Sequence, residues 1–252
     1  MKVELIACTP DADKIVAAAA KLCYAKSDIN TLMDKLTPDK VEDFLDMLGR
    51  LGHESPVEHA VFTFGIEGVS RALLAQITRH RIASFSVQSQ RYVDKSSFEY
   101  ITPPEIADIP EALEEFKAAM EEDARHYERL KSILSSKRYQ KNLEAGMSEE
   151  EAEKAANKSA NEDARFVLPN ACDTRMILTM NVRSLRNFFR LRCCSRAQWE
   201  IRELATEMLR LCRNAAPLLF ATAGPACLTG KCAEGAFTCG RINEVREKYK
   251  NL

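Results

Sequence analysis

The chain has 252 residues, of which 46% are hydrophobic and 29% charged, as is ordinary for a globular protein. Its 36 basic residues nearly balance its 37 acidic ones, which argues against a dedicated nucleic-acid or membrane-surface binder. No apolar run approaches the roughly 18 residues needed to span a bilayer, and the N-terminus lacks a signal-peptide core. Because nine cysteines are an odd number and no secretion signal is seen, we expect mostly free thiols and a cytoplasmic protein.

The apolar pattern before residue 70 predicts two strands and two helices. In chain order they are a strand at 2–8, a helix at 11–26, a helix at 37–49 and a strand at 60–66. Thr37 is the expected N-cap of the second helix and Pro38 its first residue. A polar turn holding two of the four histidines separates this helix from the second strand.

Between residues 70 and 213 the pattern is mainly helical. Its elements are a helix from Ser70 to about Arg81, a loop at 82–97, a long helix from Glu111 to about Leu134, a helix from Ser148 to about Val167, a strand from Thr174 to Val182, a helix capped by Ser184 that ends near Cys194, and a helix from Ala197 to Arg213. With no repeat and no clean linker, we expect a single α+β domain over 1–252 rather than two domains. Its central sheet should be mainly antiparallel and flanked by long helices, followed by a Cys/Gly-rich tail from about 224.

Two windows of the chain contain arginine but no Asp, Glu or Lys. Residues 71–93 hold four arginines and one histidine, and residues 174–196 hold six arginines. Acidic residues occupy 37 of 252 positions, or about three in 23 residues, so two empty windows are unusual. A guanidinium group offers a rigid fork to phosphate or carboxylate, which suggests an anionic partner. Pairing with the acid-rich helices at 111–163 is the alternative for any single arginine.

The ordinary nucleotide-binding motifs are missing from the sequence. Neither a dinucleotide-binding G-x-G-x-x-G nor a phosphate-binding G-x-x-x-x-G-K-[ST] occurs, so side chains would have to hold any phosphate. The triplet Arg79-His80-Arg81 is the strongest candidate, because three adjacent cations repel one another unless an anion lies nearby. Taken alone, the triplet is equally well explained as a solvated charge run.

Together with its neighbours, the triplet resembles the flavin-dependent thymidylate synthases, which carry R-H-R-x7-S-x-R. Residues 79–91 (RHRIASFSVQSQR) fit this pattern in full. Further segments follow the family's order: 52–59 (GHESPVEH), 164–169 (ARFVLP), 181–188 (NVRSLRNF) with Leu191-Arg192, and 197–200 (AQWE). The resemblance therefore covers about residues 50–210 in five separate elements.

This resemblance implies an enzyme that methylates dUMP to dTMP. Methylenetetrahydrofolate would supply the carbon, and FAD reduced by NADPH would supply the hydride. Homotetramers with active sites shared between subunits are implied as well, without nucleic-acid or membrane partners. The absence of a convincing Cys–His nucleophile pair agrees with hydride chemistry of this kind.

The resemblance also implies roles for individual residues. The positions that match flavin contacts are Ser55, Arg79, His80, Arg81, Val87, Asn181, Arg183 and Asn187. The positions that match dUMP contacts are Gln76, Arg79, Ser89, Gln90, Arg91, Arg165 and Arg192. Arg192 matches the residue thought to favour ionisation at N3 of uracil, and we treat it as the catalytic residue. Val87 departs from relatives that carry Glu or Gln, so a polar contact there is lost or made by backbone.

Other interpretations remain open at this point. An arginine-rich RNA-binding or nucleotide-sensing protein would lack catalysis, although near-zero net charge and few aromatic residues in the windows count against it. Cys227, Cys232 and Cys239 could bind zinc with Cys212 as a fourth ligand, but their spacing is not that of a standard site. Ser89 is better interpreted as a substrate-binding hydroxyl than as a nucleophile, because no histidine is obviously placed as its base. Because the cysteine spacing fits no standard metal site, we expect no bound metal.

Overall fold

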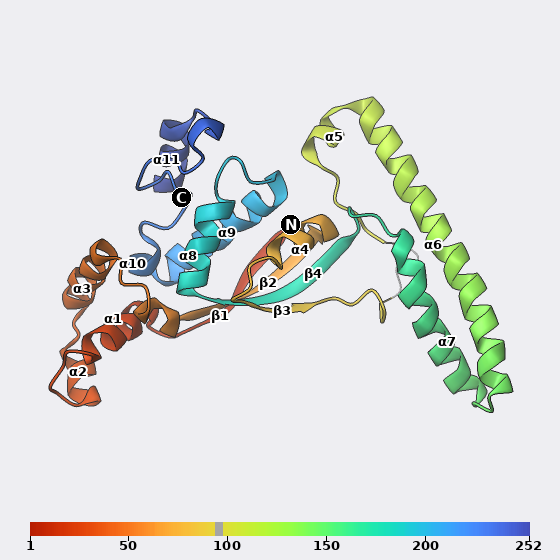
Figure 1. The fold of residues 1–252 in the computed structure, drawn as a ribbon, viewed down its shortest axis with the longest axis horizontal. Coiled ribbons are helices and arrows are strands. Elements are labelled where there is room, and N and C mark those ends of the chain that lie inside the picture. The colour runs from red at the N-terminus through yellow and green to blue at the C-terminus, as the bar shows by residue number, and fades with distance from the viewer. Residues whose placement is uncertain (94–97) are drawn as a thin grey trace. The chain divides into compact units, whose positions relative to one another are not determined.

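A computed structural model describes residues 1–93 and 98–252 of the chain. Its strands are β1 (Lys2–Cys8), β2 (Val61–Ser70), β3 (Ser84–Val87) and β4 (Asp173–Asn181). Its α-helices are α1 (Ala12–Leu22), α2 (Ile29–Lys35), α3 (Pro38–Leu51), α4 (Arg71–Ile77), α5 (Pro104–Asp108), α6 (Pro110–Glu144), α7 (Glu149–Ala164), α8 (Val182–Arg192), α9 (Trp199–Ala215), α10 (Pro217–Phe220) and α11 (Ile242–Lys250). The strands form one antiparallel sheet in the order β1-β2-β4-β3, which confirms the α+β class (Figure 1).

The chain divides into two compact units. Unit 1 comprises Met1–Glu67, Gln76–Ser86 and Met176–Leu252, and unit 2 comprises Gly68–Ala75 and Val87–Arg175. The single-domain organisation stays a prediction.

The core of unit 1 lies between the sheet and helices α8, α9 and α10. Strand β2 alternates, with Phe62, Phe64 and Ile66 fully buried and the residues between them more exposed. In the core, the ring of Phe220 meets the ring of Phe62 edge-on at 5.3 Å and the ring of Phe189 at 6.0 Å. This packing fixes α8, the helix that carries four of the six arginines of the second window, onto the sheet.

Helix α3 illustrates how local sequence sets an element's limits. Thr37 occupies its N-cap position without a side-chain hydrogen bond, and Pro38 is its first residue, where the missing N–H is not needed. Gly52 ends the helix in the left-handed conformation at a φ of 69°, which favours glycine. The segment that follows includes the short 3₁₀ helix Pro56–His59 and contains Glu54 and Glu58, which both belong to unit 1.

Unit 2 is built around a helical hairpin in which α6 and α7 run side by side (Figure 1). Ser148 and Glu151 form a complete capping box at the start of α7. Small side chains at every fourth position bring α7 close to its neighbour, and all four are fully buried: Ala152, Ala156, Ala160 and Ala164.

A second, smaller core of unit 2 surrounds Cys172. This residue is fully buried with Phe98 and Met120, and Tyr100 and Leu168 pack against the group. The backbone N–H groups of Arg71 and Ala72 donate to the carbonyls of Cys172 and Asn170, both at 3.1 Å. The start of α4 is thereby fixed to the turn that precedes β4.

Several predicted limits were wrong. The loop expected at 82–97 contains strand β3, because a four-residue strand of alternating Ser with Phe and Val leaves little periodic signal; the part at 94–97 lies outside the described residues. The helix expected to end near Leu134 continues to Glu144, since neither Gly nor Pro occurs between Leu134 and Gly146. The helix predicted to reach Arg81 ends at Ile77.

The N-cap predicted for α8 was also wrong. Asn181 occupies this position in place of Ser184, and its Oδ1 accepts from the backbone N–H of Ser184 at 2.8 Å. Strand β4 ends at Asn181 in an extended conformation, which is the geometry an N-cap needs, and asparagine is a strong cap. Helices α2, α5, α10 and α11 had not been predicted.

Two general features concern the described residues as a whole. None of the cysteines there lies in a disulfide bond. Nor does any helix in this part of the chain combine the length and the apolar character required to cross a membrane.

Candidate functional site

A cavity of about 760 Å³ opens on unit 1 beside helix α8. Helix α8 supplies more of its lining than any other element, and the segments at 54–58 and 79–82 supply most of the rest. The lining residues are Glu54, Glu58, Arg79, His80, Arg81, Ile82, Asn181, Arg183, Ser184, Arg186, Asn187, Arg190, Leu191 and Arg192. Six arginines against two carboxylates give the cavity an excess of positive charge, which suits an anionic ligand.

At one part of this cavity Arg192 is held by His80. The Nε–H of Arg192 donates to Nε2 of His80 at 3.1 Å, so Nε2 must be unprotonated. Burial, followed by the charge of Arg192, lowers the pKa of His80 below its ordinary value near 6.5. The His80 ring also meets the Phe188 ring edge-on, with centroids 5.0 Å apart. His80 is therefore a neutral acceptor that orients a charged guanidinium.

A second cation faces Arg192. Burial, followed by the charge of Arg79, lowers the pKa of Arg192 from the usual value for arginine. Arginine nevertheless keeps its proton at any physiological pH. Two guanidinium groups that repel each other at a cavity wall favour an anion between them.

The turn after α4 places the triplet 79–81 at this cavity. Helix α4 ends at Ile77, and the N–H of His80 donates to the Ile77 carbonyl at 3.0 Å. The chain therefore turns immediately after the helix, and all three side chains of the triplet line the cavity.

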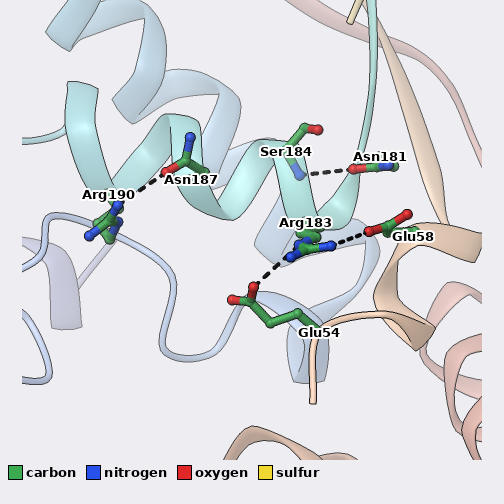
Figure 2. Close-up of polar contacts among 7 residues, drawn as sticks. All are labelled: Glu54, Glu58, Asn181, Arg183, Ser184, Asn187 and Arg190. Carbon is green, nitrogen blue, oxygen red and sulfur yellow. Dashed lines mark hydrogen bonds and ion pairs between the residues drawn. The ribbon is translucent and has the colours of Figure 1, made fainter. Parts of the chain in front are cut away.

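Arg183 lies between two carboxylates at another part of the cavity (Figure 2). Its Nη1 is 2.5 Å from Oε1 of Glu58, and its Nε is 3.3 Å from Oε2 of Glu54. Glu58 and then Glu54 raise the pKa of the Arg183 guanidinium. All three side chains are about half exposed, so the pairs hold Arg183 in place while contributing little to stability.

The first two turns of α8 supply the neutral polar groups of the cavity. The Oδ1 of Asn181 is occupied by the cap bond to Ser184, which leaves the side-chain NH₂ group to meet a ligand. One and a half turns later, Oδ1 of Asn187 accepts from Nη2 of Arg190 at 3.3 Å (Figure 2). Two carboxamides that line the same cavity suit a planar heterocycle with both donors and acceptors.

Arg186 forms part of the cavity wall without a free guanidinium. Its Nε and Nη2 donate to the Leu219 carbonyl at 3.0 and 2.7 Å, which ties α8 to α10. Sequence reasoning assigned no ligand role to seven lining residues: Glu54, Glu58, Ile82, Ser184, Arg186, Arg190 and Leu191. Glu58 belongs to the 52–59 motif and could have been found there, whereas Glu54 lies at a position where the family pattern G-H-x-[ST]-P-x-E-H fixes no residue type.

The predicted flavin-contacting residues fall in two groups. Six of them line the cavity of unit 1: Arg79, His80, Arg81, Asn181, Arg183 and Asn187. Ser55 belongs to the same unit but not to the lining, and Val87 lies on β3 within unit 2.

The predicted dUMP-contacting residues are divided as well. Arg79 and Arg192 line the cavity of unit 1, and Gln76 lies on α4 in the same unit. The other four belong to unit 2: Ser89, Gln90, Arg91 and Arg165.

The four residues in unit 2 have local partners. Nε2 of buried Gln90 lies 3.6 Å from the Cys172 sulfur, and the Ser89 hydroxyl accepts from the N–H of Arg91 at 3.2 Å. The guanidinium of Arg91 pairs with Glu162 at 3.1 Å. Arg91 thus follows the alternative of pairing with an acid-rich helix, whereas Arg183 pairs with carboxylates outside 111–163.

A metal centre built on the cysteine tail finds no support in the described part of the chain. No group of three or more His, Cys, Asp or Glu there is arranged to hold a metal ion. Cys212, the suggested fourth ligand, is fully buried in α9, and burial raises its thiol pKa well above the usual value.

The antiparallel sheet and the arginine-lined cavity are those of a protein suited to a large anionic ligand with a planar, hydrogen-bonding part, as a nucleotide cofactor has. Residues 4–218 match the model of the family described as thymidylate synthase complementing protein. The flavin-dependent thymidylate synthase of Clostridium tetani is 50% identical over 99% of this chain and 97% of its own length. Those of Geobacter sulfurreducens and Pyrococcus horikoshii are 46% and 37% identical, each over 100% of this chain. The chain belongs to the thymidylate synthase complementing protein family.

Proposed function

We propose that this protein methylates dUMP to dTMP as a flavin-dependent thymidylate synthase. The one-carbon donor is methylenetetrahydrofolate, and NADPH is the reductant. The observation that carries the proposal is the gathering of six arginines and a neutral histidine around one cavity, in a chain whose full-length relatives bear this name. No local nucleotide motif produces this arrangement, since its parts come from three segments far apart in the chain.

The cavity fits FAD in size and charge. Ligand pockets for molecules of this class measure roughly 300–1,000 Å³, and this cavity of about 760 Å³ falls within that range. Its arginines suit a diphosphate, and the Asn181 and Asn187 carboxamides suit the edge of a heterocycle. The residues we assign to FAD are Ser55, Arg79, His80, Arg81, Val87, Asn181, Arg183 and Asn187. When bound and reduced by NADPH, FAD supplies the hydride that completes the methyl group.

Arg192 acts on the pyrimidine in this proposal. His80 holds its guanidinium by a 3.1 Å hydrogen bond, so the charge is preoriented before substrate arrives. A fixed guanidinium stabilises negative charge that develops on uracil when N3 loses its proton, and it does not donate a proton itself. This makes the C5 position of the ring more nucleophilic toward an electrophilic methylene carbon.

The remaining substrate residues bind and orient dUMP. They are Gln76, Arg79, Ser89, Gln90, Arg91 and Arg165. Three arginines among them match the dianionic phosphate, while the Ser89 hydroxyl and the two carboxamides suit the sugar and base. Arg91 must exchange part of its pairing with Glu162 for the substrate.

The electron balance distinguishes this reaction from one in which folate itself is the reductant. A methylene group needs two electrons and a proton to become a methyl group. With NADPH supplying the electrons through FAD, each dTMP is accompanied by one NADP⁺ and one tetrahydrofolate. The proposal further includes a homotetramer with shared active sites in the cytoplasm, which sedimentation and fractionation would test.

The test of this function begins with the visible spectrum of the purified protein. We expect a flavin spectrum, retained or restored by added FAD, and NADPH oxidation that speeds up when dUMP is added. Arg192→Ala should keep FAD while losing about 100-fold or more in turnover, the usual result of removing one preorganised donor. A colourless protein that neither binds FAD nor responds to dUMP would exclude the proposal, and full activity in Arg192→Ala would exclude the assigned role.

A further inference from the structure

The proposed function assigns no role to helix α11, although this helix reaches the residue beside Arg192. Val245 and Tyr249 are the buried residues of α11. The Tyr249 hydroxyl donates to the Cys193 carbonyl at 3.0 Å, and Cys193 follows Arg192 directly in the chain. Helix α11 therefore contacts the end of the helix that presents the proposed catalytic residue.

The Cys193 carbonyl needs a donor of this kind. Cys193 is the C-cap residue of α8 and is only 1% exposed. The last carbonyl groups of a helix have no N–H partner within it, and a buried carbonyl without any partner costs free energy. The Tyr249 hydroxyl supplies the donor, and by fixing this carbonyl it also fixes the residue next to Arg192.

The number of available protons sets the direction of each hydrogen bond at Tyr249. A carbonyl only accepts, so the single hydroxyl proton of Tyr249 points to Cys193. The Thr206 hydroxyl lies 2.9 Å from the Tyr249 oxygen, and it is then the donor between these two hydroxyls. Burial raises the pKa of Tyr249 above its usual value of 10.0, so the phenol keeps its proton at any physiological pH. Tyr249 is therefore a permanent donor to Cys193.

The backbone around Tyr249 is held as well. Arg213 of α9 donates from Nη1 to the Tyr249 carbonyl at 2.6 Å and from Nη2 to the Ala223 carbonyl at 2.9 Å. Arg246 of α11 donates from Nε to the Cys227 carbonyl at 2.8 Å. Because these contacts fix α11 to α9 and to the tail, the Tyr249 hydroxyl is a fixed point for the end of α8.

We propose that Tyr249 is a positioning residue for Arg192, which acts through the Cys193 carbonyl. This inference rests on the proposed function and deepens it. His80 holds the guanidinium of Arg192 by the 3.1 Å hydrogen bond, and Tyr249 holds the backbone at the other end of the same residue. A preorganised charge stabilises a transition state because it need not move when the opposite charge develops. Losing either contact lets Arg192 occupy orientations that do not stabilise the uracil anion.

The test begins with Tyr249→Phe, which removes the hydroxyl and keeps the buried ring. Turnover is measured on the full-length, FAD-loaded protein and expressed per bound FAD, so that unfolded chains do not count. We expect kcat to fall about 3- to 10-fold, as loss of one hydrogen bond does. FAD retention and the KM for methylenetetrahydrofolate should stay as in the wild type, because Arg192 is assigned to the pyrimidine.

A double-mutant cycle with Arg192→Ala separates positioning from general support of the fold. If Tyr249 acts through Arg192, adding Tyr249→Phe to Arg192→Ala should change turnover by less than about 2-fold. The matched control is Tyr24→Phe, which removes the same hydroxyl from a residue of unit 1 that is 83% exposed. This control should leave turnover unchanged.

Three outcomes would overturn the proposal. The same several-fold loss in the wild-type and Arg192→Ala backgrounds would show that Tyr249 only supports the fold. Unchanged turnover in Tyr249→Phe, or loss of FAD from this variant, would overturn it as well. Wild-type protein that forms no dTMP would instead refute the proposed function, and full activity in Arg192→Ala would refute the role of Arg192, so both are measured first.

Discussion

The hydrogen bond between Arg192 and His80 can be removed without removing the arginine. His80→Ala deletes the acceptor, whereas His80→Gln keeps an acceptor oxygen at similar reach and abolishes titration. The bond joins a charged donor to a neutral acceptor at 3.1 Å in a partly exposed site, which places its contribution at about 1–2 kcal/mol. We therefore expect kcat/KM for dUMP to fall about 5- to 30-fold in His80→Ala and to recover largely in His80→Gln.

The pH dependence provides an independent measure of the same bond. Protonation at Nε2 would turn the acceptor into a donor and place a positive charge against Arg192. Because the pKa of His80 is lowered from 6.5, wild-type activity should persist at pH 6.5 and decline at more acidic pH. The sign for stability is the same, since the unfolded chain binds this proton more readily: the protein loses stability as pH falls below about 6.5. His80→Gln should lack this component of both profiles.

The assay is steady-state dTMP formation at saturating FAD, with flavin occupancy measured for each variant because His80 also lines the cavity that we assign to FAD. His126→Ala is the matched control, since His126 is exposed on α6 in unit 2. Equal losses in His80→Ala and His80→Gln, with an unchanged acidic limb of the pH profile, would refute the idea that His80 acts as the acceptor for Arg192.

Three other predictions concern separate parts of the molecule. Asn187→Ala should weaken FAD retention more than dUMP binding, measured by flavin release on dilution, and equal loss of both would indicate misfolding. Glu54→Gln removes one of two carboxylates beside Arg183 and should tighten FAD binding by a few-fold at low salt, an effect that 1 M NaCl should erase; weaker binding at low salt would contradict it. Ser148→Ala should lower the free energy of unfolding by about 1 kcal/mol through loss of the capping box, with activity retained. Urea denaturation measures that loss, and unchanged stability would argue against the cap.

Local sequence patterns correctly predicted those helix and strand ends that are set by residues adjacent in the chain. Strand β1 was predicted with its observed limits from alternation alone, and Pro38 marked the start of α3. Where packing decides, the sequence was less informative. The last ten residues of α6 carry little apolar periodicity, yet the helix continues beside α7.

The same difference between local sequence patterns and contacts made in the folded chain applies to the candidate site. Motif resemblance identified half of the residues that line the cavity, but not the contacts that hold them. Arg192 and His80 are 112 positions apart in the chain, and Arg183 and Glu58 are 125 apart. No periodicity or spacing connects residues at such separations, so these pairs become visible only in the folded chain. Glu54 had no signal of its own, because the family pattern G-H-x-[ST]-P-x-E-H fixes no residue type at its position.

The most direct test of the central claim is the stoichiometry of the complete reaction. Purified protein with FAD, dUMP, methylenetetrahydrofolate and NADPH should form dTMP, NADP⁺ and tetrahydrofolate in equal amounts. When dUMP is omitted, neither dTMP nor tetrahydrofolate should form, and NADP⁺ should appear only through slow oxidation of NADPH. Formation of dTMP with dihydrofolate and without NADPH consumption would mean that the folate supplies the hydride, and would contradict the account.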